Sequence, residues 1–380
     1  MTRKREFGHC RRIVIKIGTS SLTHKTGKLN LGQMEKLVRE MADLYNEGRE
    51  LLLVTSGAVG AGMGRLGLKT RPKTIPEKQA CAAVGQGLLM QVYENLFSQF
   101  GITVGQVLLT RDDFADRRRF LNARNTLLTL LRFGILPIIN ENDTVAVDEI
   151  RFGDNDTLSA LVTNLVDAEM LLILSDVGGL YTADPKKDPT ARFVFEVEKI
   201  TPELVAVAGG ASSAASSGGM VTKFQAAQIV GQAGAVMVIA AATEDNILRR
   251  VLAGEEVGTV FWPAQRYLKG RKRWILFGTA VQGKIHIDEG AARALREEGR
   301  SLLPSGIVGV EGDFEAGHAV SIVAPDGQEI ARGLANYSAA EVARMKGLKT
   351  REIAALMGAQ PYDEVVHRDN LVLTQVIEGR

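Results

Sequence analysis

Cysteine is scarce in this sequence, which excludes frameworks built on disulfides or structural zinc. The 380 residues include only two cysteines, Cys10 and Cys81. Two cysteines cannot form a disulfide framework, and their separation matches no zinc-binding spacing. We therefore expect two reduced thiols in a cytoplasmic protein.

Long apolar runs are absent as well. No run approaches the roughly 18 consecutive apolar residues that a membrane helix requires. The basic segment 1–12 precedes only a short apolar run, Ile13–Ile17, which Lys16 interrupts. Such a run is too short for the apolar part of a secretion signal. The sequence therefore predicts no membrane partner, a cytoplasmic location and a loose N-terminal extension over 1–12.

Neither sign of charge dominates the composition. Lysine and arginine number 46, aspartate and glutamate number 44, and the formal net charge is +2. The overall charge therefore gives no reason to expect nucleic acid or an anionic membrane as a partner. A hydrophobic share of 45% and a charged share of 24% are typical of a soluble globular protein, and the length suits two domains.

Short apolar runs recur along the first two thirds of the chain, and each is continuous rather than alternating. They are Ile13–Ile17, Leu51–Val54, Val104–Leu109, Ile135–Ile139, Met170–Leu174 and Ala235–Ala240. Continuous runs are typical of strands buried on both faces of a parallel sheet. Helical patterns lie between them, the clearest over 31–47 behind a predicted N-cap at Asn30. Several helical patterns end in a glycine that suits a left-handed cap, namely Gly48, Gly101, Gly134 and Gly234. This alternation predicts an α/β fold, a three-layer sandwich around a mainly parallel central sheet.

The alternation ends near Trp262, and a different organisation follows. The residues after it are rich in lysine and arginine, as in a solvated linker. Further on, Asp326-Gly327 lies between two β-prone segments, which indicates a hairpin. We therefore predict an α/β domain over 1–262, a linker over 263–279, a small mixed, β-rich domain over 280–360 and a tail over 361–380.

Three segments have the composition of phosphate-binding loops. They are Ile15–Ser20, Val54–Gly62 and Ser217–Lys223. Glycine lets the backbone approach an anion, helix N-termini direct N–H groups at it, and ligands collect at the carboxyl ends of strands in open α/β sheets. Lys16 lies inside a buried strand, where its charge is costly unless an anion neutralises it. A side chain that reaches solvent or pairs with a carboxylate is the alternative.

Two common nucleotide-binding motifs are not supported. Gly62, Gly64 and Gly67 match the spacing of the dinucleotide fingerprint, but Pro72 and Pro76 interrupt the following segment and no second strand pattern appears. The sequence contains no G-x-x-x-x-G-K-[ST] string, which argues against a P-loop.

Amide and acidic residues gather in two loops. Asn140–Asp143 follows a predicted strand, and Gly153–Asp156 precedes a helical pattern. An Asp or Asn before an apolar helix is ordinarily a cap, which is an alternative for Asp154. The two loops hold more polar groups than capping needs, and buried carboxylates repel one another unless lysine, metal or an ammonium ligand meets them. No residue is assigned as a metal ligand.

Taken together, these motifs resemble the amino acid kinase family over nearly the whole chain. Val14–Ser20 resembles the family's opening lysine–glycine loop, and Val54–Ala58 resembles the turn that binds the amino acid. The resemblance implies substrate contacts from Ser56, Asp143 and Asn155, and catalytic roles for Lys16, Lys223 and Asp156. The ATP contacts that it implies are Lys16, Ser175, Asp176, Ser217, Gly218, Gly219, Met220, Val221, Thr222 and Lys223.

The C-terminal part of the chain, from Ile275 to about Gly358, resembles a PUA domain. The pairing of the two domains implies ATP-dependent phosphorylation of the side-chain carboxylate of L-glutamate to L-glutamyl 5-phosphate and ADP, with Mg²⁺ as a cofactor. This reaction is the first step of proline biosynthesis. The resemblance further implies feedback inhibition by proline, a homo-oligomer and hand-over of the product to glutamyl-phosphate reductase.

The residue types fit such a reaction. A glutamate carboxylate has a pKa of about 4.3 in solution, so at pH 7 it is ionised and needs no general base. Only His9 and His24 precede residue 280. We predict that Lys16 and Lys223 neutralise the transferring phosphoryl group from two sides. Asp156 would hold the lysines by ion pairing or help to order the metal.

Two other functions stay open. Another kinase of the same family, acting on acetylglutamate, aspartate, carbamate or UMP, would share the sheet and the lysines. PUA domains in other proteins bind RNA, which depends on basic surface. Between Gly306 and Tyr337 the acidic residues outnumber the basic ones, with Glu311, Asp313, Glu315, Asp326 and Glu329 against Arg332. Nucleic acid is therefore not expected as a partner, and only the basic linker favours it.

Overall fold

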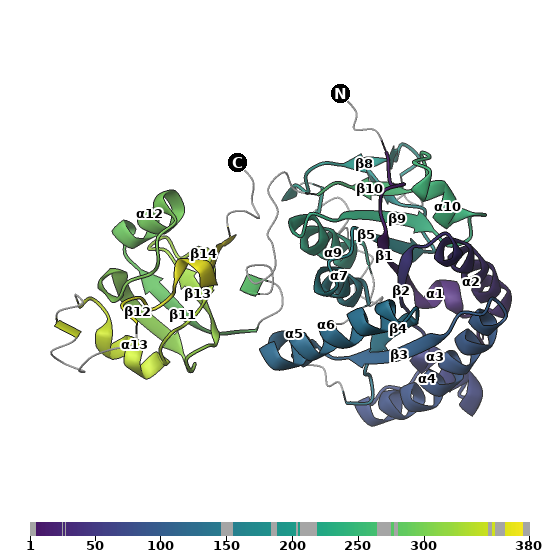
Figure 1. The fold of residues 1–380 in the computed structure, drawn as a ribbon, viewed down its shortest axis with the longest axis horizontal. Coiled ribbons are helices and arrows are strands. Elements are labelled where there is room, and N and C mark those ends of the chain that lie inside the picture. The colour runs from purple at the N-terminus through teal and green to yellow at the C-terminus, as the bar shows by residue number, and fades with distance from the viewer. Residues whose placement is uncertain are drawn as a thin grey trace. The chain divides into compact units, whose positions relative to one another are not determined.

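Figure 1 shows the fold in a computed structural model of the chain. The structure describes residues 5–24, 26, 28–145, 155–183, 188–202, 204–205, 219–263, 275–276, 280–348, 352–353 and 362–374. The chain divides into a first unit, Met1–Tyr267, and a second unit, Leu268–Arg380. Among the described residues, no helix has both the length and the apolar character needed to cross a bilayer.

The first unit is built on one eight-stranded sheet with the order β3-β4-β2-β1-β5-β9-β10-β8. Its strands are β1 (Arg12–Ile17), β2 (Glu50–Val54), β3 (Val104–Leu109), β4 (Leu136–Glu141), β5 (Met170–Ser175), β8 (Glu196–Val197), β9 (Val236–Ala241) and β10 (Thr259–Phe261). All neighbours run parallel except β9 and β10. A separate antiparallel ribbon joins β6 (Leu180–Tyr181) to β7 (Phe193–Val194). Every strand predicted from a continuous apolar run is present, and the mainly parallel sheet is confirmed.

The helices of the first unit connect these strands. They are α1 (Thr19–Leu22), α2 (Leu31–Asn46), α3 (Ala58–Leu66), α4 (Ile75–Ser98), α5 (Arg111–Ala115), α6 (Arg117–Arg132), α7 (Asn155–Leu165), α9 (Met220–Gln232) and α10 (Ile247–Leu252). The side chain of Asn30 accepts a hydrogen bond from the Gln33 amide at 3.2 Å, so the predicted N-cap of α2 is confirmed. The four predicted cap glycines all have positive φ: Gly48, Gly101, Gly134 and Gly234.

Helices cover both faces of the sheet, which confirms the three layers (Figure 1). On one face Ile13, Ile15 and Ile17 of β1 pack in a core with α2, α4 and α10. On the other face α7 and α9 pack against each other, α7 on β1 and α9 on β9. Because side chains alternate along a strand, Lys16 lies on the face that α7 and α9 cover.

The N-terminal segment is packed rather than loose over residues 5–11, so that prediction is wrong for this part. The guanidinium of Arg5 donates to the carbonyl oxygens of Phe195 at 2.7 Å and Glu255 at 3.0 Å. Phe7 is 2% exposed, and its ring lies 5.7 Å from that of Trp262. The basic composition suggested solvation, but the single apolar residue and the hydrogen bonds of Arg5 hold the segment on the sheet.

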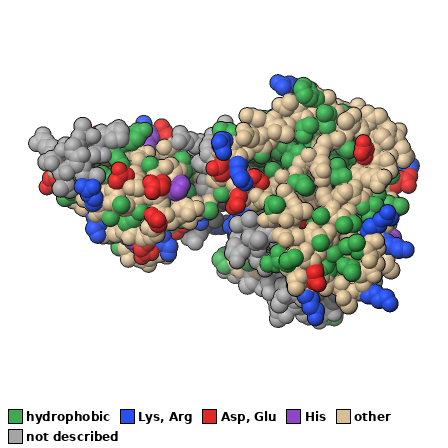
Figure 2. Space-filling view, turned by 90° about the horizontal axis from the view of Figure 1, so that it is seen from below, with side chains coloured by type: hydrophobic (Ala, Val, Ile, Leu, Met, Phe, Trp, Pro, Cys, Tyr) green, Lys and Arg blue, Asp and Glu red, His purple; other side chains and the backbone are tan. Residues whose placement is uncertain are grey.

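The second unit contains a five-stranded mixed sheet with the order β12-β11-β13-β14-β15. Its elements are β11 (Val281–Ile287), α12 (Glu289–Glu298), η1 (Pro304–Gly306), β12 (Ile307–Gly312), β13 (Ala319–Val323), β14 (Glu329–Leu334), α13 (Ala339–Met345), η2 (Arg368–Asn370) and β15 (Leu371–Leu373). The predicted hairpin joins β13 to β14, with Gly327 at a φ of 80°. On the face of this unit that is visible in Figure 2, acidic and basic side chains are both present.

One prediction about the second unit needs correction. Residues 361–380 were expected to form a tail, yet β15 pairs with β14 as the edge strand of the sheet. Leu371 and Val372 are buried there, at 6% and 3% exposure. A three-residue strand gives too short an apolar run to be recognised in the sequence. Its partner, β14, is also distant along the chain, so no hairpin signal marks it.

The helices α3 and α4 approach each other closely at glycines. An added Cβ at Gly62 would lie 1.8 Å from the carbonyl oxygen of Cys81, and one at Gly85 would lie 1.8 Å from that of Ala58. Gly62 and Gly64 lie inside α3 and Gly67 caps its end. Gly62 therefore serves helix packing and Gly67 ends a helix, so these glycines form no dinucleotide turn, as the sequence predicts.

We expect Gly85→Ala to lower the melting temperature. The added methyl group would force α3 and α4 apart, and overpacking of this kind costs about 1–3 kcal/mol. Gly87 is the matched control, because it lies on the same helix and an added Cβ there meets no atom within 4 Å. Gly87→Ala should stabilise the helix by about 1 kcal/mol. Thermal unfolding followed by circular dichroism compares the variants, and equal melting temperatures would contradict the close helix contact.

Candidate active site

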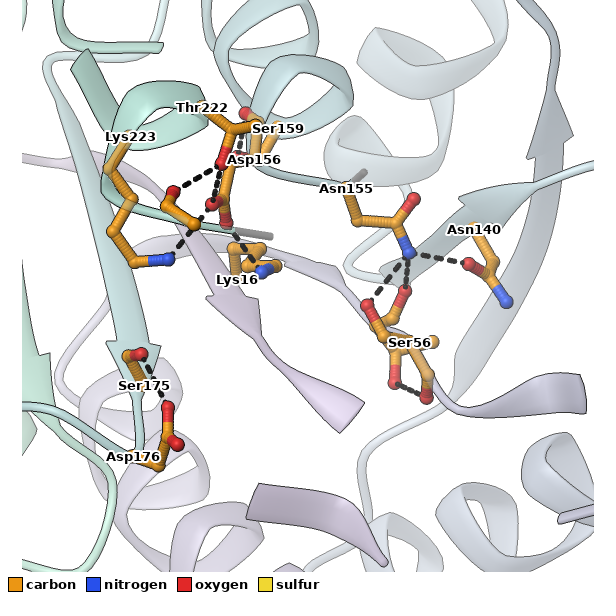
Figure 3. A network of polar contacts seen from close by, with 12 residues as sticks. Lys16, Ser56, Asn140, Asn155, Asp156, Ser159, Ser175, Asp176, Thr222 and Lys223 are labelled. Atoms are coloured by element: carbon orange, nitrogen blue, oxygen red, sulfur yellow. Dashed lines mark hydrogen bonds and ion pairs between the residues drawn. The ribbon is translucent and has the colours of Figure 1, made fainter. Parts of the chain in front are cut away.

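The predicted site residues lie where strands of the first unit end and two helices begin. Lys16 is the fifth residue of β1, Ser56 follows β2, and Asn140 lies near the end of β4. Helix α7 begins at Asn155, and α9 begins at Met220. Figure 3 shows that these elements bring two polar groups together, one around Asp156 and one around Asn155. Ligands bind at this edge of open α/β sheets.

Asp156 joins the two predicted catalytic lysines. Its Oδ1 forms an ion pair with the Nζ of Lys16. Its Oδ2 accepts a hydrogen bond from the Nζ of Lys223 at 3.0 Å. Figure 3 shows both ammonium groups directed at this one carboxylate, Lys16 from β1 and Lys223 from α9. We call Lys16, Asp156 and Lys223 the charge triad.

The charge triad is buried and carries one excess positive charge. The side chain of Asp156 is 0% exposed, and those of Lys16 and Lys223 are 8% and 6% exposed. Burial raises the pKa of Asp156, but attraction to Lys16 and then Lys223 outweighs it, so the pKa lies below its ordinary value. Within the charge triad, two ammonium groups therefore share one carboxylate.

The start of α9 adds further polar groups beside the triad. The hydroxyl of Thr222 lies 3.0 Å from Oδ2 of Asp156 and 2.7 Å from the carbonyl oxygen of Gly219. Gly219 is the N-cap and has no side chain to satisfy the first N–H groups of the helix. Helix N-termini of this kind bind phosphate. Ser217 and Gly218, which were predicted to contact ATP, lie outside the described residues, as does Asp154.

The second polar group is a chain of amides. The two N–H groups on Nδ2 of Asn155 are shared among three acceptors, the carbonyl oxygen of Thr55 at 2.7 Å, the Oγ of Ser56 at 2.8 Å and the Oδ1 of Asn140 at 2.9 Å. The predicted contacts Ser56 and Asn155 are thus brought together. Asn140 in turn donates to Gln86 of α4 at 2.8 Å. We call Gln86, Asn140, Asn155 and Ser56 the amide chain.

Comparison with known proteins places the chain in a family. The model of the amino acid kinase family matches residues 11–241, and that of the PUA domain matches residues 283–357. The chain belongs to the amino acid kinase family. It is 60% identical over 367 residues to the glutamate 5-kinase of Moorella thermoacetica, with 97% of each chain covered. It is 56% identical over 364 residues to that of Carboxydothermus hydrogenoformans, with 96% and 97% covered.

A solved structure supports the fold. The carbamate kinase from Giardia lamblia bound to AMP-PNP aligns with a TM-score of 0.50 over 67% of this chain and 99% of its own. Its sequence identity is 18%, so the likeness concerns the fold alone. The resemblance stated from the motifs is confirmed, both for the kinase domain and for the PUA domain.

Two of the ATP contacts predicted for this amino acid kinase, Ser175 and Asp176, lie apart from the charge triad. Ser175 ends β5, and its hydroxyl donates to Oδ1 of Asp176 at 3.1 Å. Figure 3 shows this pair away from Asp156. Asp143 is half-buried in the turn that follows β4. The roles of these residues toward a ligand stay predictions.

Sequence reasoning missed two residues that support the site. Gln86 and Tyr93 both belong to α4, and Tyr93 places its hydroxyl 2.9 Å from that of Thr55. Neither belongs to a glycine loop or an acidic cluster, so no motif marks them. The one available signal was their spacing. A glutamine and a tyrosine seven residues apart on a helix lie on the same face, so both could have been expected to point in one direction.

The described residues provide no ready-made metal cage. Among them, no three His, Cys, Asp or Glu side chains gather closely enough to hold an ion. Mg²⁺ in phosphoryl-transfer sites is held by one or two carboxylates together with substrate phosphates. Both oxygens of Asp156 already contact a lysine. This arrangement favours the first of the two roles predicted for Asp156, which is to hold the lysines.

We expect Asp156→Asn to destabilise the chain in a pH-dependent way. Removing one partner of a buried ion pair costs about 3–5 kcal/mol, which urea unfolding at pH 7 would show. Because the pKa of Asp156 is lowered in the folded chain, its contribution is complete above the ordinary pKa of about 3.9. It is lost as pH falls through the lower folded-state value. The stability gap between the two proteins should therefore be constant from pH 7 to about pH 4 and shrink below that.

Asp245→Asn is the matched control for this experiment. Asp245 pairs with Lys36 at 2.7 Å, but its side chain is 92% exposed. Exposed ion pairs contribute little to stability, so this variant should unfold almost like the unaltered chain. Equal stability of the two variants would contradict a buried charge triad.

Proposed function

We propose that this chain transfers the γ-phosphoryl group of ATP to the side-chain carboxylate of L-glutamate, giving L-glutamyl 5-phosphate and ADP. The observation that supports this most directly is the charge triad, because it places two ammonium groups around one carboxylate near the carboxyl end of a central strand. The curated relatives named glutamate 5-kinase match the chain at 60% and 56% identity over nearly its whole length. Their name specifies glutamate among the substrates of the family.

The reaction needs charge neutralisation and alignment rather than proton transfer. The glutamate side chain is ionised at neutral pH, since its pKa in solution is about 4.3. A carboxylate oxygen attacks the γ-phosphorus, a new P–O bond forms, and the bond to the bridging oxygen of ADP breaks with its electrons on ADP. No proton is exchanged. The step is accelerated by groups that stabilise charge on the transferring phosphoryl oxygens.

Lys16 and Lys223 are the groups proposed to stabilise that charge. They approach Asp156 from different elements, so a phosphoryl group bound beside the carboxylate would meet an ammonium group on either side. Asp156 fixes both side chains and prevents their mutual repulsion from opening the site. Thr222 and the first N–H groups of α9 lie on the same side and would hold the ATP phosphates.

The amide chain is proposed to hold glutamate. Ser56 and Asn155 meet at the turn after β2, and Gly57, the N-cap of α3, has no side chain to cap that helix. The first N–H groups of α3 would therefore be available to a carboxylate. Asp143 in the neighbouring turn would attract the ammonium group of the amino acid.

The nucleotide is proposed to extend toward the end of β5. Ser175 and Asp176 lie there, next to the segment that leads into β6. Mg²⁺, held mainly by the ATP phosphates, would neutralise part of their charge.

A hydroxamate assay tests the activity directly. With ATP, Mg²⁺ and hydroxylamine, an acyl phosphate is trapped as a hydroxamate, so L-glutamate should give coloured product and stoichiometric ADP. Acetylglutamate, aspartate, carbamate and UMP should release far less ADP under the same conditions. Turnover of one of these in preference to glutamate would replace the proposed substrate and leave the family unchanged.

Lys223→Ala should reduce turnover much more than glutamate affinity. Removal of one preorganised charge from a transition-state site typically costs roughly 10²–10³ in kcat. The KM for glutamate should change little, because Lys223 lies in the charge triad and not in the amide chain. Lys73→Ala, at an exposed lysine of the same unit, is the control. A loss confined to the KM for glutamate would make Lys223 a binding residue.

Further properties are proposed on the strength of the family. They are a cytoplasmic location, a place at the first step of proline biosynthesis, inhibition by proline, a homo-oligomer and hand-over of the labile acyl phosphate to glutamyl-phosphate reductase. A proline titration of the glutamate-dependent rate checks the inhibition, and an unaltered rate would exclude it. The boundary of the kinase domain at 262 and the start of the PUA domain at 280 also stay proposals.

A further inference from the structure

Helix α4 supports the ends of two strands from behind the proposed glutamate site. Gln86 contacts Asn140 at the end of β4, and Tyr93 contacts Thr55 after β2. Both side chains are buried, Gln86 at 9% and Tyr93 at 1% exposure. The missing side chain of Gly85 lets this turn of α4 lie against Ala58, the first residue of α3. Gln86 therefore lies directly behind the turn that is proposed to bind a carboxylate.

The direction of the amide chain is set by two backbone groups. The N–H of Glu141 donates to Oδ1 of Asn140 at 2.9 Å, which fixes that atom as an acceptor. The Nδ2 of Asn140 must then donate to Oε1 of Gln86. At the other end, the carbonyl oxygen of Thr55 accepts from Nδ2 of Asn155. A carbonyl cannot donate, so the amide of Asn155 is fixed in direction as well.

This direction determines what Ser56 can offer a ligand. The Nδ2 of Asn155 lies 2.8 Å from the Oγ of Ser56 and donates to it. An amide nitrogen accepts no hydrogen bond, so the hydroxyl proton of Ser56 cannot be directed back at Asn155. It is available to an acceptor such as a carboxylate oxygen. If the amide of Asn155 were reversed, its Oδ1 would face Ser56. The hydroxyl of Ser56 would then donate to Asn155 and not to a ligand.

Gln86 maintains this arrangement by accepting a hydrogen bond, but its own amide donor stays buried and unpaired within the part of the chain that the structure describes. Its Oε1 is used by Asn140, while its Nε2 has no hydrogen-bond partner among the described residues. The unpaired Nε2 donor destabilises the fold, while the hydrogen bond to Oε1 satisfies the buried amide of Asn140. A glutamine at this position is therefore explained by its contact with Asn140.

We propose that Gln86 is a positioning residue for the glutamate site, acting through Asn140 and Asn155 to hold the hydroxyl of Ser56 as a donor. The proposal rests on the assignment of glutamate to the amide chain. Gln86 belongs to the amide chain, whereas the phosphoryl group is assigned to the charge triad. Loss of Gln86 should therefore affect glutamate binding and not the chemical step.

The test compares three variants of the full chain in the hydroxamate assay. Gln86→Met removes the acceptor for Asn140 and should raise the KM for glutamate roughly 10-fold or more. The kcat and the KM for ATP should stay within about 2-fold of the unaltered values. Gln86→Glu keeps an acceptor at the same place and should retain most of the affinity for glutamate. Gln232→Met is the matched control, a buried glutamine at the end of α9, and should leave all three constants unchanged.

Melting temperatures separate positioning from a merely structural role. Gln86→Met removes the unpaired Nε2 donor but leaves the Nδ2 of Asn140 without its acceptor, so the two effects offset each other and the melting temperature should change little. An unchanged KM for glutamate in Gln86→Met would overturn the proposal, as would parallel losses in kcat, ATP affinity and melting temperature. Failure of Gln86→Glu to retain affinity would also overturn it. Hydroxamate formation by the unaltered chain tests the proposed function separately, so its failure is distinguishable from failure of this inference.

Discussion

A buried carboxylate between two lysines is the interaction on which the arrangement of the site depends. Three charged groups lie almost out of contact with water, and such burial is tolerated only when the charges compensate one another. Asp156 of α7 compensates Lys16 of β1 and Lys223 of α9, and so ties the centre of the sheet to both helices of one layer. The compensation is incomplete by one positive charge, which is the property that a phosphoryl group requires.

The start of α7 connects the two halves of the site. Asn155 and Asp156 are consecutive, and consecutive residues on a helix point in directions about 100° apart. One side chain therefore enters the amide chain and the other enters the charge triad (Figure 3). Because a single peptide bond separates them, the proposed acceptor carboxylate and the phosphoryl group are brought within reach of each other by one rigid element. Reaction between bound partners depends on such alignment.

Much of the fold could be predicted because its signals are local. Continuous apolar runs, a capping asparagine and glycines after helices are each written in a few neighbouring residues, and the strands and caps they indicate are present. The errors concern segments whose stability comes from distant partners. Arg5 is held by carbonyl groups about 190 and 250 residues away, and β15 is held by β14. Such distant partners cannot be identified from the residues of the segment alone.

The sequence by itself determined the order of the strands along the chain, through its apolar runs, and the family, through the resemblance of its motifs to the amino acid kinases. Lys16 stood out because charge within an apolar strand is costly, whereas the catalytic roles of Asp156 and Lys223 were implied by the family resemblance. Only the tertiary structure decided which charges meet, that both lysines share one carboxylate, and that Gln86 and Tyr93 of α4 contact Asn140 and Thr55. Those contacts join residues from different strands and helices, and their distances are fixed by the packing of α4, α7 and α9 on the sheet.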